Sequence, residues 1–165
     1  MATASGDREH GMRAGTLTAV GVVATVLAYA VLATRWVSSD AGWYDALPKP
    51  AWQPPDWVFG VAWPYNFVAL FVAGIALALQ HPGRPALAWL VVLMISVGFA
   101  LGWAYLFYVP HRLSLAAISL AVAAALTWGL VLIAGRTEAW TGWVLLPYAI
   151  WMSVATSLAV GFAGQ

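Results

Sequence analysis

Five long runs of apolar residues, separated by short polar links, divide this chain of 165 residues. Each run is close to the ~20 residues that a helix needs to cross a bilayer. The runs are apolar on every face, so they lack the alternation of a membrane-spanning strand, and their backbone groups have to be satisfied within helices. We therefore expect an all-α membrane protein, a five-transmembrane-helix bundle, with helices at about 17–37, 57–79, 86–109, 113–134 and 140–162.

The composition agrees with a lipid environment. Hydrophobic residues make up 63% of the chain and charged residues only 8%, and the mean hydropathy is +0.84, well outside the range of soluble domains. The first run is too long for the apolar core of a signal peptide, so we expect it to remain as a helix of the mature protein.

The links predict the organisation. Three of them, "QHPGRP", "PHR" and "GRTE", are so short that neighbouring helices must be antiparallel and in contact. Residues 1–16 form a polar tail, which we expect to be frayed, and residues 17–165 form the transmembrane domain. Five crossings place the termini on opposite sides, and four Arg or Lys residues against three slightly favour a cytoplasmic N-terminus.

The charged residues exclude several functions. All six acidic residues lie in the tail, in a loop or at a helix end, and the three histidines lie in the tail or in links. A proton-coupled carrier or a bis-histidine haem site would need such groups inside the spans, and the absence of cysteine excludes thiolate sites. We expect no metal site, no required cofactor and no nucleic-acid partner.

Tryptophan is abundant, with 11 residues. The structural interpretation is a belt of tryptophans at the membrane–water interface. It suits Trp36, Trp57, Trp89, Trp140 and Trp143. Another four, Trp63, Trp103, Trp128 and Trp151, each lie a turn or more inside a span. A buried indole N–H needs an acceptor that lipid does not offer, so these four are either packed internally or face a ligand.

Helical spacing groups the inner aromatic residues into stripes. In the second run Phe59, Trp63, Asn66, Phe67 and Leu70 share a face. Proline follows Trp63 and recurs before Tyr148, so both helices should bend where they carry aromatic side chains. The other two stripes are Phe99, Trp103 and Phe107, and Tyr148, Trp151 and Ala155. The stripes could enclose a flat apolar ligand or form an aromatic core without one.

Gly98 and Gly102 form a GxxxG pair on another face of the third run. Small residues at this spacing allow close approach of two helices. The pair could serve a contact inside the bundle or a homodimer, and we favour the homodimer.

The only long link, residues 38–56, is here called the first loop. It contains "WYDALPKPAWQPP", with four prolines, three aromatic residues and a lysine. Proline restricts the unfolded loop, so less entropy is lost when the loop is ordered. The loop is either a rigid interfacial spacer or a lid over the bundle, and we favour the lid.

This segment, followed by "VFGVAW", resembles the hallmark of the translocator protein family, also called tryptophan-rich sensory proteins (TspO/MBR). "LLPYAIWMSVATSL" resembles the fifth-helix signature of that family. The resemblance extends over roughly residues 17–158 and implies a bacterial-type member in a bacterial cell membrane. Compared with the family pattern, alanine replaces asparagine at Ala100 and Ala159, alanine replaces proline at Ala104, and Phe67 replaces tyrosine, so we expect a drier pocket.

The resemblance implies a binding protein, a sensor or carrier, for porphyrins such as protoporphyrin IX. In this family Trp63 and Trp151 would face the ligand and offer N–H donors, Tyr44, Pro54 and Phe59 would form the lid side, and Trp103 would close the wall. Some bacterial relatives resemble photo-oxidative enzymes, in which case Trp63 and Trp151 would be the catalytic pair. Three hypotheses stay open: a porphyrin binder, a light- and oxygen-dependent tetrapyrrole-degrading enzyme, and a structural partner of another membrane complex. The expected partners are membrane lipid, a hydrophobic small molecule and a second copy of the chain.

Overall fold

The computed structural model describes residues 3–37 and 39–164. Residues 1, 2, 38 and 165, which belong to the expected tail, first loop and last segment, lie outside the described residues. The described part is helical, and five of its helices are long and apolar enough to cross a membrane. The elements are α1 (Thr3–Val37), α2 (Ala41–Ala46), α3 (Asp56–Gln80), α4 (Arg84–Tyr108), α5 (Leu113–Thr137) and α6 (Ala139–Ala163). The predicted all-α bundle of five long helices is confirmed.

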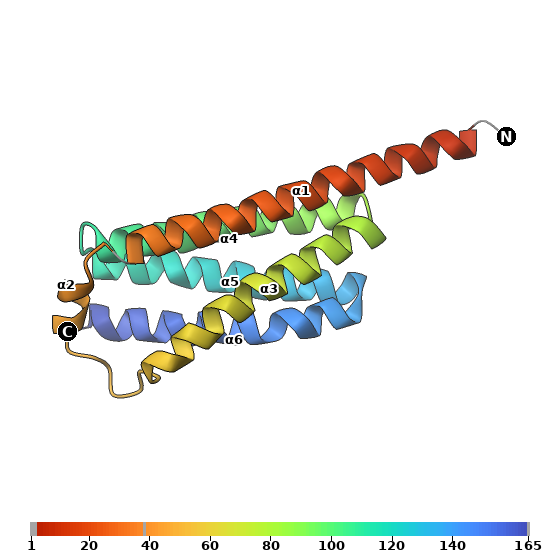
Figure 1. The fold of residues 1–165 in the computed structure, drawn as a ribbon. Coiled ribbons are helices and arrows are strands. Elements are labelled where there is room, and N and C mark those ends of the chain that lie inside the picture. The colour runs from red at the N-terminus through yellow and green to blue at the C-terminus, as the bar shows by residue number, and fades with distance from the viewer. Residues whose placement is uncertain (1–2, 38, 165) are drawn as a thin grey trace.

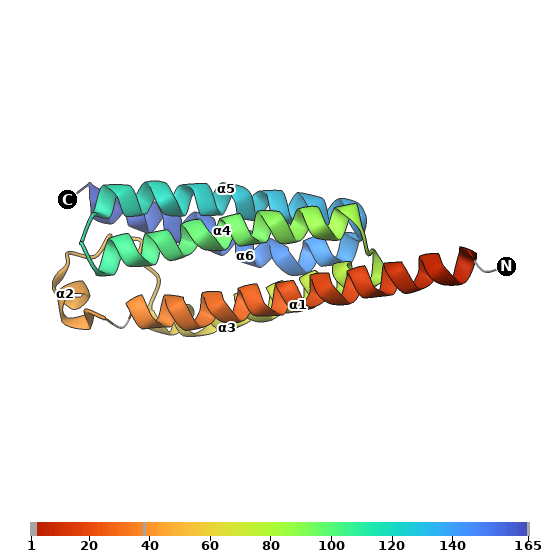
Figure 2. The same cartoon turned by 90° about the horizontal axis from the view of Figure 1, so that it is seen from above.

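The five long helices close into a ring. α1 packs against α3 and α4, α3 packs against α6, and α5 lies between α4 and α6. Figures 1 and 2 show α4, α5 and α6 running side by side, with α1 and α3 as a layer on one side of them. The short helix α2 lies across one end of the bundle, at the same end as the C-terminus (Figure 1).

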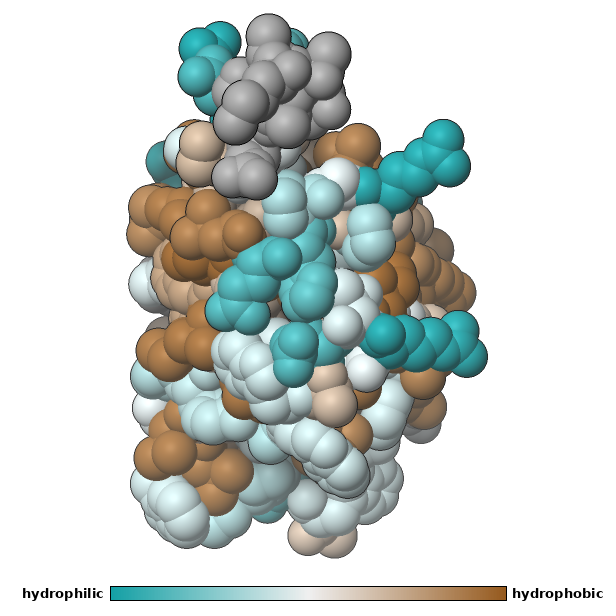
Figure 3. Space-filling model, turned by 90° about the vertical axis from the view of Figure 1, so that its right-hand side faces the viewer, coloured by the Kyte–Doolittle hydropathy of each residue, from teal (hydrophilic) through white to brown (hydrophobic). Residues whose placement is uncertain are grey.

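The N-terminal tail differs from the prediction. It was expected to be frayed, but α1 is helical from Thr3. Extending a formed helix costs far less than nucleating a new one, so the span can propagate into the tail. α1 leaves the bundle near Gly15, where an added Cβ would lie 2.7 Å from the Ala78 carbonyl oxygen. Its polar part projects beyond the other helices (Figure 1), and hydrophilic residues gather at this end of the molecule (Figure 3).

α5 and α6 form the tightest hairpin. Only Glu138 separates them, and a Cβ added to Gly142 would lie 2.7 Å from the Gly135 Cα. The Thr141 hydroxyl and backbone N–H both donate to the Glu138 carbonyl, at 2.6 and 3.0 Å. The two backbones therefore meet directly near this link.

Trp89 lies in the core and not in an interfacial belt, which corrects the expectation for this residue. It is fully buried, and its indole N–H donates to the Leu130 carbonyl at 3.2 Å. Its ring fits against Gly74, where an added Cβ would lie 2.6 Å from both the Trp89 ring and Val22. Trp128 differs in the opposite direction, because it is partly exposed and donates to the Ser153 hydroxyl at 3.1 Å.

Candidate ligand cavity

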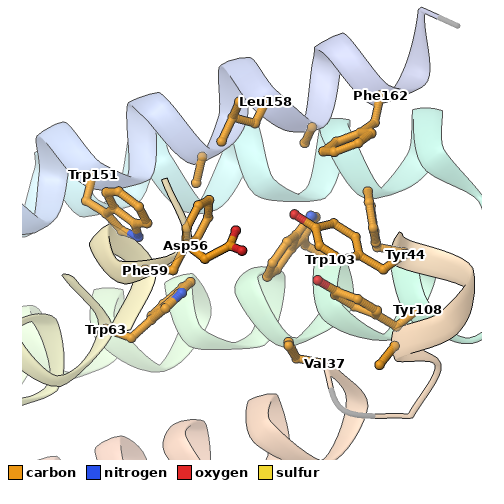
Figure 4. A pocket seen from close by; sticks show the side chains of 14 residues that line it. Val37, Tyr44, Asp56, Phe59, Trp63, Trp103, Tyr108, Trp151, Leu158 and Phe162 are labelled. Atoms are coloured by element: carbon orange, nitrogen blue, oxygen red, sulfur yellow. The ribbon is translucent and has the colours of Figure 1, made fainter. Parts of the chain in front are cut away.

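A cavity of about 300 Å³, here called the inner cavity, lies between α3, α4 and α6 and under α2. Figure 4 shows Trp63 and Trp151 at one end of it and Tyr44, Tyr108 and Phe162 at the other, with Trp103 between. Its volume is at the lower end of the ~300–1,000 Å³ typical of ligand pockets. The lining residues are Val37, Ala41, Tyr44, Asp56, Phe59, Trp63, Trp103, Phe107, Tyr108, Trp151, Ala155, Leu158, Ala159 and Phe162.

At the deep end of the inner cavity, aromatic side chains of α3 and α6 meet edge to face. The rings of Trp63 and Trp151 have centroids 6.5 Å apart at 84°, and Phe59 meets Trp151 at 5.1 Å. Both parent helices contain a proline, Pro64 in α3 and Pro147 in α6. A proline removes one backbone hydrogen bond from its helix, and each lies close to a tryptophan of this wall.

Two of the tryptophans that line the cavity have unsatisfied indole donors. The indole nitrogens of Trp103 and Trp151 are shielded from solvent and have no hydrogen-bond partner among the residues that the structure describes. A buried N–H without an acceptor costs about 1–3 kcal/mol, and such groups are rare in native structures. An acceptor atom inside the cavity would remove this cost.

The first loop covers the open end of the inner cavity. Asp40 caps α2 by accepting from the Trp43 backbone N–H at 3.1 Å. The Trp43 ring stacks on His111 at 3.8 Å and 21°, and His111 Nε2 lies 3.5 Å from Asp40 Oδ2. Because His111 lies in the link between α4 and α5, these contacts attach α2 to that end of the bundle. The backbone of His111 is left-handed, with φ of 54°.

Tyr44 inserts its ring beneath this cover. The ring meets Tyr108 and Phe162, each with centroids 5.9 Å away, and Lys49 Nζ lies 5.5 Å from the Tyr44 centroid. Burial raises the pKa of the Tyr44 hydroxyl above its ordinary value, and the carboxylate of Asp56 adds to the rise.

The rest of the first loop rests on α6. A Cβ added to Gly161 would lie 2.9 Å from both Pro50 and Trp52, so the loop backbone approaches this helix closely. Pro50 is buried there. The loop is thus held at two places, by α2 on the α4–α5 link and by Pro50 on α6.

The structure brings together only part of the predicted site. The predicted residues that line the inner cavity are Tyr44, Phe59, Trp63, Trp103, Phe107, Trp151 and Ala155, and those that do not line it are Pro54, Asn66, Phe67, Phe99 and Tyr148.

Pro54 lies in the first loop, and the other four residues lie on the long helices. Phe67 stacks on Trp63 at 6.1 Å, behind the wall, and Tyr148 is buried in the hydrophobic core. Phe99 is 40% exposed on the surface of α4. Asn66 lines a different cavity, between α3 and α6. These side chains share a helix with the lining residues but point in other directions.

Several lining residues were not predicted. Leu158, Ala159 and Phe162 continue the Trp151 and Ala155 stripe at i+3 and i+4 spacing, so the sequence did carry this signal. Asp56 places a carboxylate on the wall (Figure 4), and nothing in the sequence distinguished it from a capping residue. Within the described part of the chain, no group of three or more His, Cys, Asp or Glu side chains could hold a metal ion.

The two glycines of the GxxxG pair have separate surroundings. A Cβ added to Gly102 would lie 3.0 Å from the Ser119 hydroxyl of α5, whereas one added to Gly98 would meet no described atom within 4 Å. Ser119 in turn donates to the Phe99 carbonyl at 2.7 Å. Gly102 therefore serves the contact between α4 and α5, and Gly98 lies open on the surface.

Comparisons with known proteins agree with this architecture. A sequence profile of the TspO/MBR family matches residues 19–164. The chain is similar to the tryptophan-rich protein TspO of Bacillus cereus, with 30% identity over 73% of this chain and 78% of that protein. It is also similar to the tryptophan-rich sensory protein of Cereibacter sphaeroides, with 31% identity over 70% of this chain and 72% of that protein. The similarity to the protein CrtK of Rhodobacter capsulatus is 28% identity over 87% of this chain and 88% of that protein. With five helices long and apolar enough to cross a membrane, the chain is a multi-pass integral membrane protein. It belongs to the TspO/MBR family.

Proposed function

We propose that this protein binds flat hydrophobic ligands of the porphyrin type in the inner cavity and acts as a sensor or carrier for them. The observation that carries the proposal is the pair of unsatisfied indole donors, Trp103 and Trp151, in an aromatic cavity closed by the first loop. Aromatic walls match the face of a porphyrin, and the carboxylate oxygens on its edge can accept from the indoles. Lys49, above the Tyr44 ring, offers a cation to a propionate.

The volume of about 300 Å³ is small for a macrocycle. A tetrapyrrole would therefore enter with the first loop displaced from Phe107 and His111. The loop would then cover the bound ring, and its prolines limit the entropy lost on closing.

The experiment is a titration of the purified protein with protoporphyrin IX, followed by quenching of tryptophan fluorescence. Trp151→Phe and Trp103→Phe each remove one donor, whose hydrogen bond is worth about 0.5–1.5 kcal/mol. Each variant should therefore raise the protoporphyrin concentration at half-maximal quenching about 2- to 10-fold. Trp128→Phe is the matched control, because this indole lines neither cavity and already donates to Ser153. Equal midpoints for all three variants and the parent protein would contradict the proposal.

A light- and oxygen-dependent degradation of the bound tetrapyrrole is the second candidate function. The direct contact of Trp63 with Trp151 on one wall favours it, since two adjacent indoles would face the ligand. Illumination with porphyrin in air should then yield a product with a new absorbance band, and Trp151→Phe should abolish the product. Binding without any product would leave the protein a sensor or carrier.

We also propose that the protein resides in a bacterial cell membrane with its N-terminus in the cytoplasm, since the relatives named above are bacterial and the Arg and Lys count slightly favours this orientation. The chain has no cysteine, so a single Gly11→Cys can report its side. Gly11 has open space around it in the described structure. A membrane-impermeant maleimide added to intact cells should leave this cysteine unlabelled, and labelling would reverse the orientation.

A further inference from the structure

A second cavity of about 510 Å³, here called the lateral groove, lies between α3 and α6. Its walls carry exposed apolar side chains such as Val61 on α3 and Ile150 on α6. In a membrane these side chains face lipid, so the groove opens toward the acyl chains. Trp151 lines both the lateral groove and the inner cavity and stands between them.

The lateral groove contains one unsatisfied polar group. Asn66, the only asparagine of the chain, is 2% exposed and lines the groove. Its Nδ2 is shielded and has no hydrogen-bond partner within residues 3–37 and 39–164. The adjacent Tyr65 is satisfied, because its hydroxyl donates to the Val144 carbonyl at 3.0 Å. An unpaired amide in an apolar wall costs several kcal/mol on water-to-hydrocarbon scales, which an acceptor in the groove would remove.

The depth of Asn66 restricts what the acceptor can be. Asn66 lies ten residues from Asp56, the first residue of α3, which is about 15 Å along a helix of about 37 Å. This is near the middle of a hydrocarbon layer of about 30 Å. The ester oxygens of phospholipids lie at the interface, too far away to reach the amide. The acceptor must belong to a molecule that carries its oxygen into the bilayer centre.

We propose that the lateral groove binds a membrane-dissolved carbonyl compound of the quinone type, a planar ring on an apolar tail, whose carbonyl oxygen accepts a hydrogen bond from the Asn66 amide. Near Asn66 the groove offers aromatic surfaces for the ring at Tyr65 and at Trp143, the residue before the Val144 acceptor of Tyr65. Branched aliphatic side chains for the tail are present at Val61 and Ile150. This site is separate from the inner cavity and does not depend on porphyrin binding there.

The single asparagine makes the test direct. Protein labelled only with [¹⁵N]asparagine, in lipid nanodiscs, gives one side-chain NH₂ signal, that of Asn66. Titration with 2-decyl-1,4-benzoquinone should shift this signal saturably. Decylbenzene, which has the same tail on a planar six-membered ring without oxygens, should leave it in place. Equal shifts with both compounds, or no shift with either, would overturn the proposal.

Two variants retain Asn66 and locate the effect. Val61→Trp fills the lateral groove and should abolish the shift caused by the quinone. Val68→Trp, two turns further along α3 and also exposed, does not line the groove and should preserve it. Circular dichroism checks that both variants keep their helix content. A signal that moves on dilution of the protein, and not with quinone, would instead place Asn66 in a contact between two copies and would also overturn the proposal.

Failure of this test would not affect the proposed porphyrin binding, because the two sites have different probes. Asn66→Leu removes the amide but no lining residue of the inner cavity. Its midpoint for protoporphyrin quenching should therefore equal that of the parent protein, whatever the quinone experiment shows.

Discussion

The indole rings of Trp63 on α3 and Trp151 on α6 meet edge to face, with centroids 6.5 Å apart. Two residues after Trp63, the Tyr65 hydroxyl of α3 donates to the Val144 carbonyl of α6. The same pair of helices thus forms the deep wall of the inner cavity and both walls of the lateral groove. Contacts between α3 and α6 therefore influence both cavities, whereas contacts of the first loop affect only the inner one.

His111→Asn should speed the exchange of ligand through the first loop. Asparagine tolerates the left-handed backbone of this position but cannot stack on Trp43. Losing an aromatic pair worth about 0.5–1.5 kcal/mol should raise the association and dissociation rates of protoporphyrin about 2- to 10-fold. Stopped-flow fluorescence measures both rates. The control is His81→Asn at the other end of the bundle. It removes the contact of His81 with the Glu138 carboxylate at 3.2 Å, which corresponds to the contact of His111 with Asp40. Equal rates in both variants would mean that the loop does not gate the cavity.

Gly74→Ala should destabilise the protein. The added Cβ would lie 2.6 Å from the Trp89 ring and from Val22, both fully buried, and overpacking of a core costs about 1–3 kcal/mol. Gly60→Ala is the matched control, because it has the same chemistry in the same helix, α3, but open space in the described structure. It should be neutral or stabilising by up to about 1 kcal/mol. Thermal melts in detergent compare the two, and equal melting temperatures would contradict the packing described for Gly74.

Trp89→Phe should also destabilise the protein, because it removes the bond to the Leu130 carbonyl and part of a buried ring. A loss of about 1–3 kcal/mol is expected from the hydrogen bond and the vacated volume together. Trp143→Phe, at a position that is 72% exposed, should change the melting temperature little. A larger loss of melting temperature in Trp143→Phe than in Trp89→Phe would favour the interfacial interpretation of Trp89.

Stability should fall with rising pH in the alkaline range, in part through Tyr44. Its pKa in the folded protein is raised above the ordinary 10.0, so the unfolded chain loses this proton first and the folded state loses stability as pH rises. The contribution is complete below pH 10 and disappears above the folded pKa. Tyr44→Phe should therefore show a shallower decline in melting temperature above about pH 10. Parallel curves would mean that Tyr44 titrates equally in both states.

We propose that two copies pair through the Gly98 face of α4, since Gly98 is open on the surface of the described structure. Gly98→Leu should then shift the protein toward the monomer in light scattering of the detergent complex. Gly102→Leu should instead lower the melting temperature, because Gly102 packs against Ser119 within the bundle. A dimer fraction unchanged by Gly98→Leu would place any dimer contact elsewhere.

The positions of the spans were predictable and the directions of their side chains were not. Helix ends at Asp56, Tyr108 and Leu113 agree with the apolar runs to within about one residue, because length and hydropathy determine where a span begins and ends. The rotation of each helix has no such signal. When every face is apolar, Phe99 and Trp103 are equally suited to lipid and to a cavity.

Features that depend on residues adjacent in sequence were predicted better than contacts between residues far apart in sequence. The cap of α2 by Asp40 and the prolines inside α3 and α6 follow from residues adjacent in sequence. The acceptor for Trp89 lies on Leu130, 41 residues away, and only the packed bundle reveals it. Asn66 shares a helical face with Trp63 but lines a different cavity, because this face is wide enough to contact both.

The placement of ionisable groups has an electrical consequence. The charged side chains of the chain lie in the tail, the links and the helix ends, so the spans carry no formal charge through the bilayer centre. A membrane potential does work of about 2.3 kcal/mol per elementary charge per 100 mV, and here it finds no charge within the spans to move. Conformational changes confined to the helices, such as a motion of α3 against α6, are therefore electrically silent. Uncharged molecules carried by them would follow their own concentration gradient and would be indifferent to the energised state of the cell.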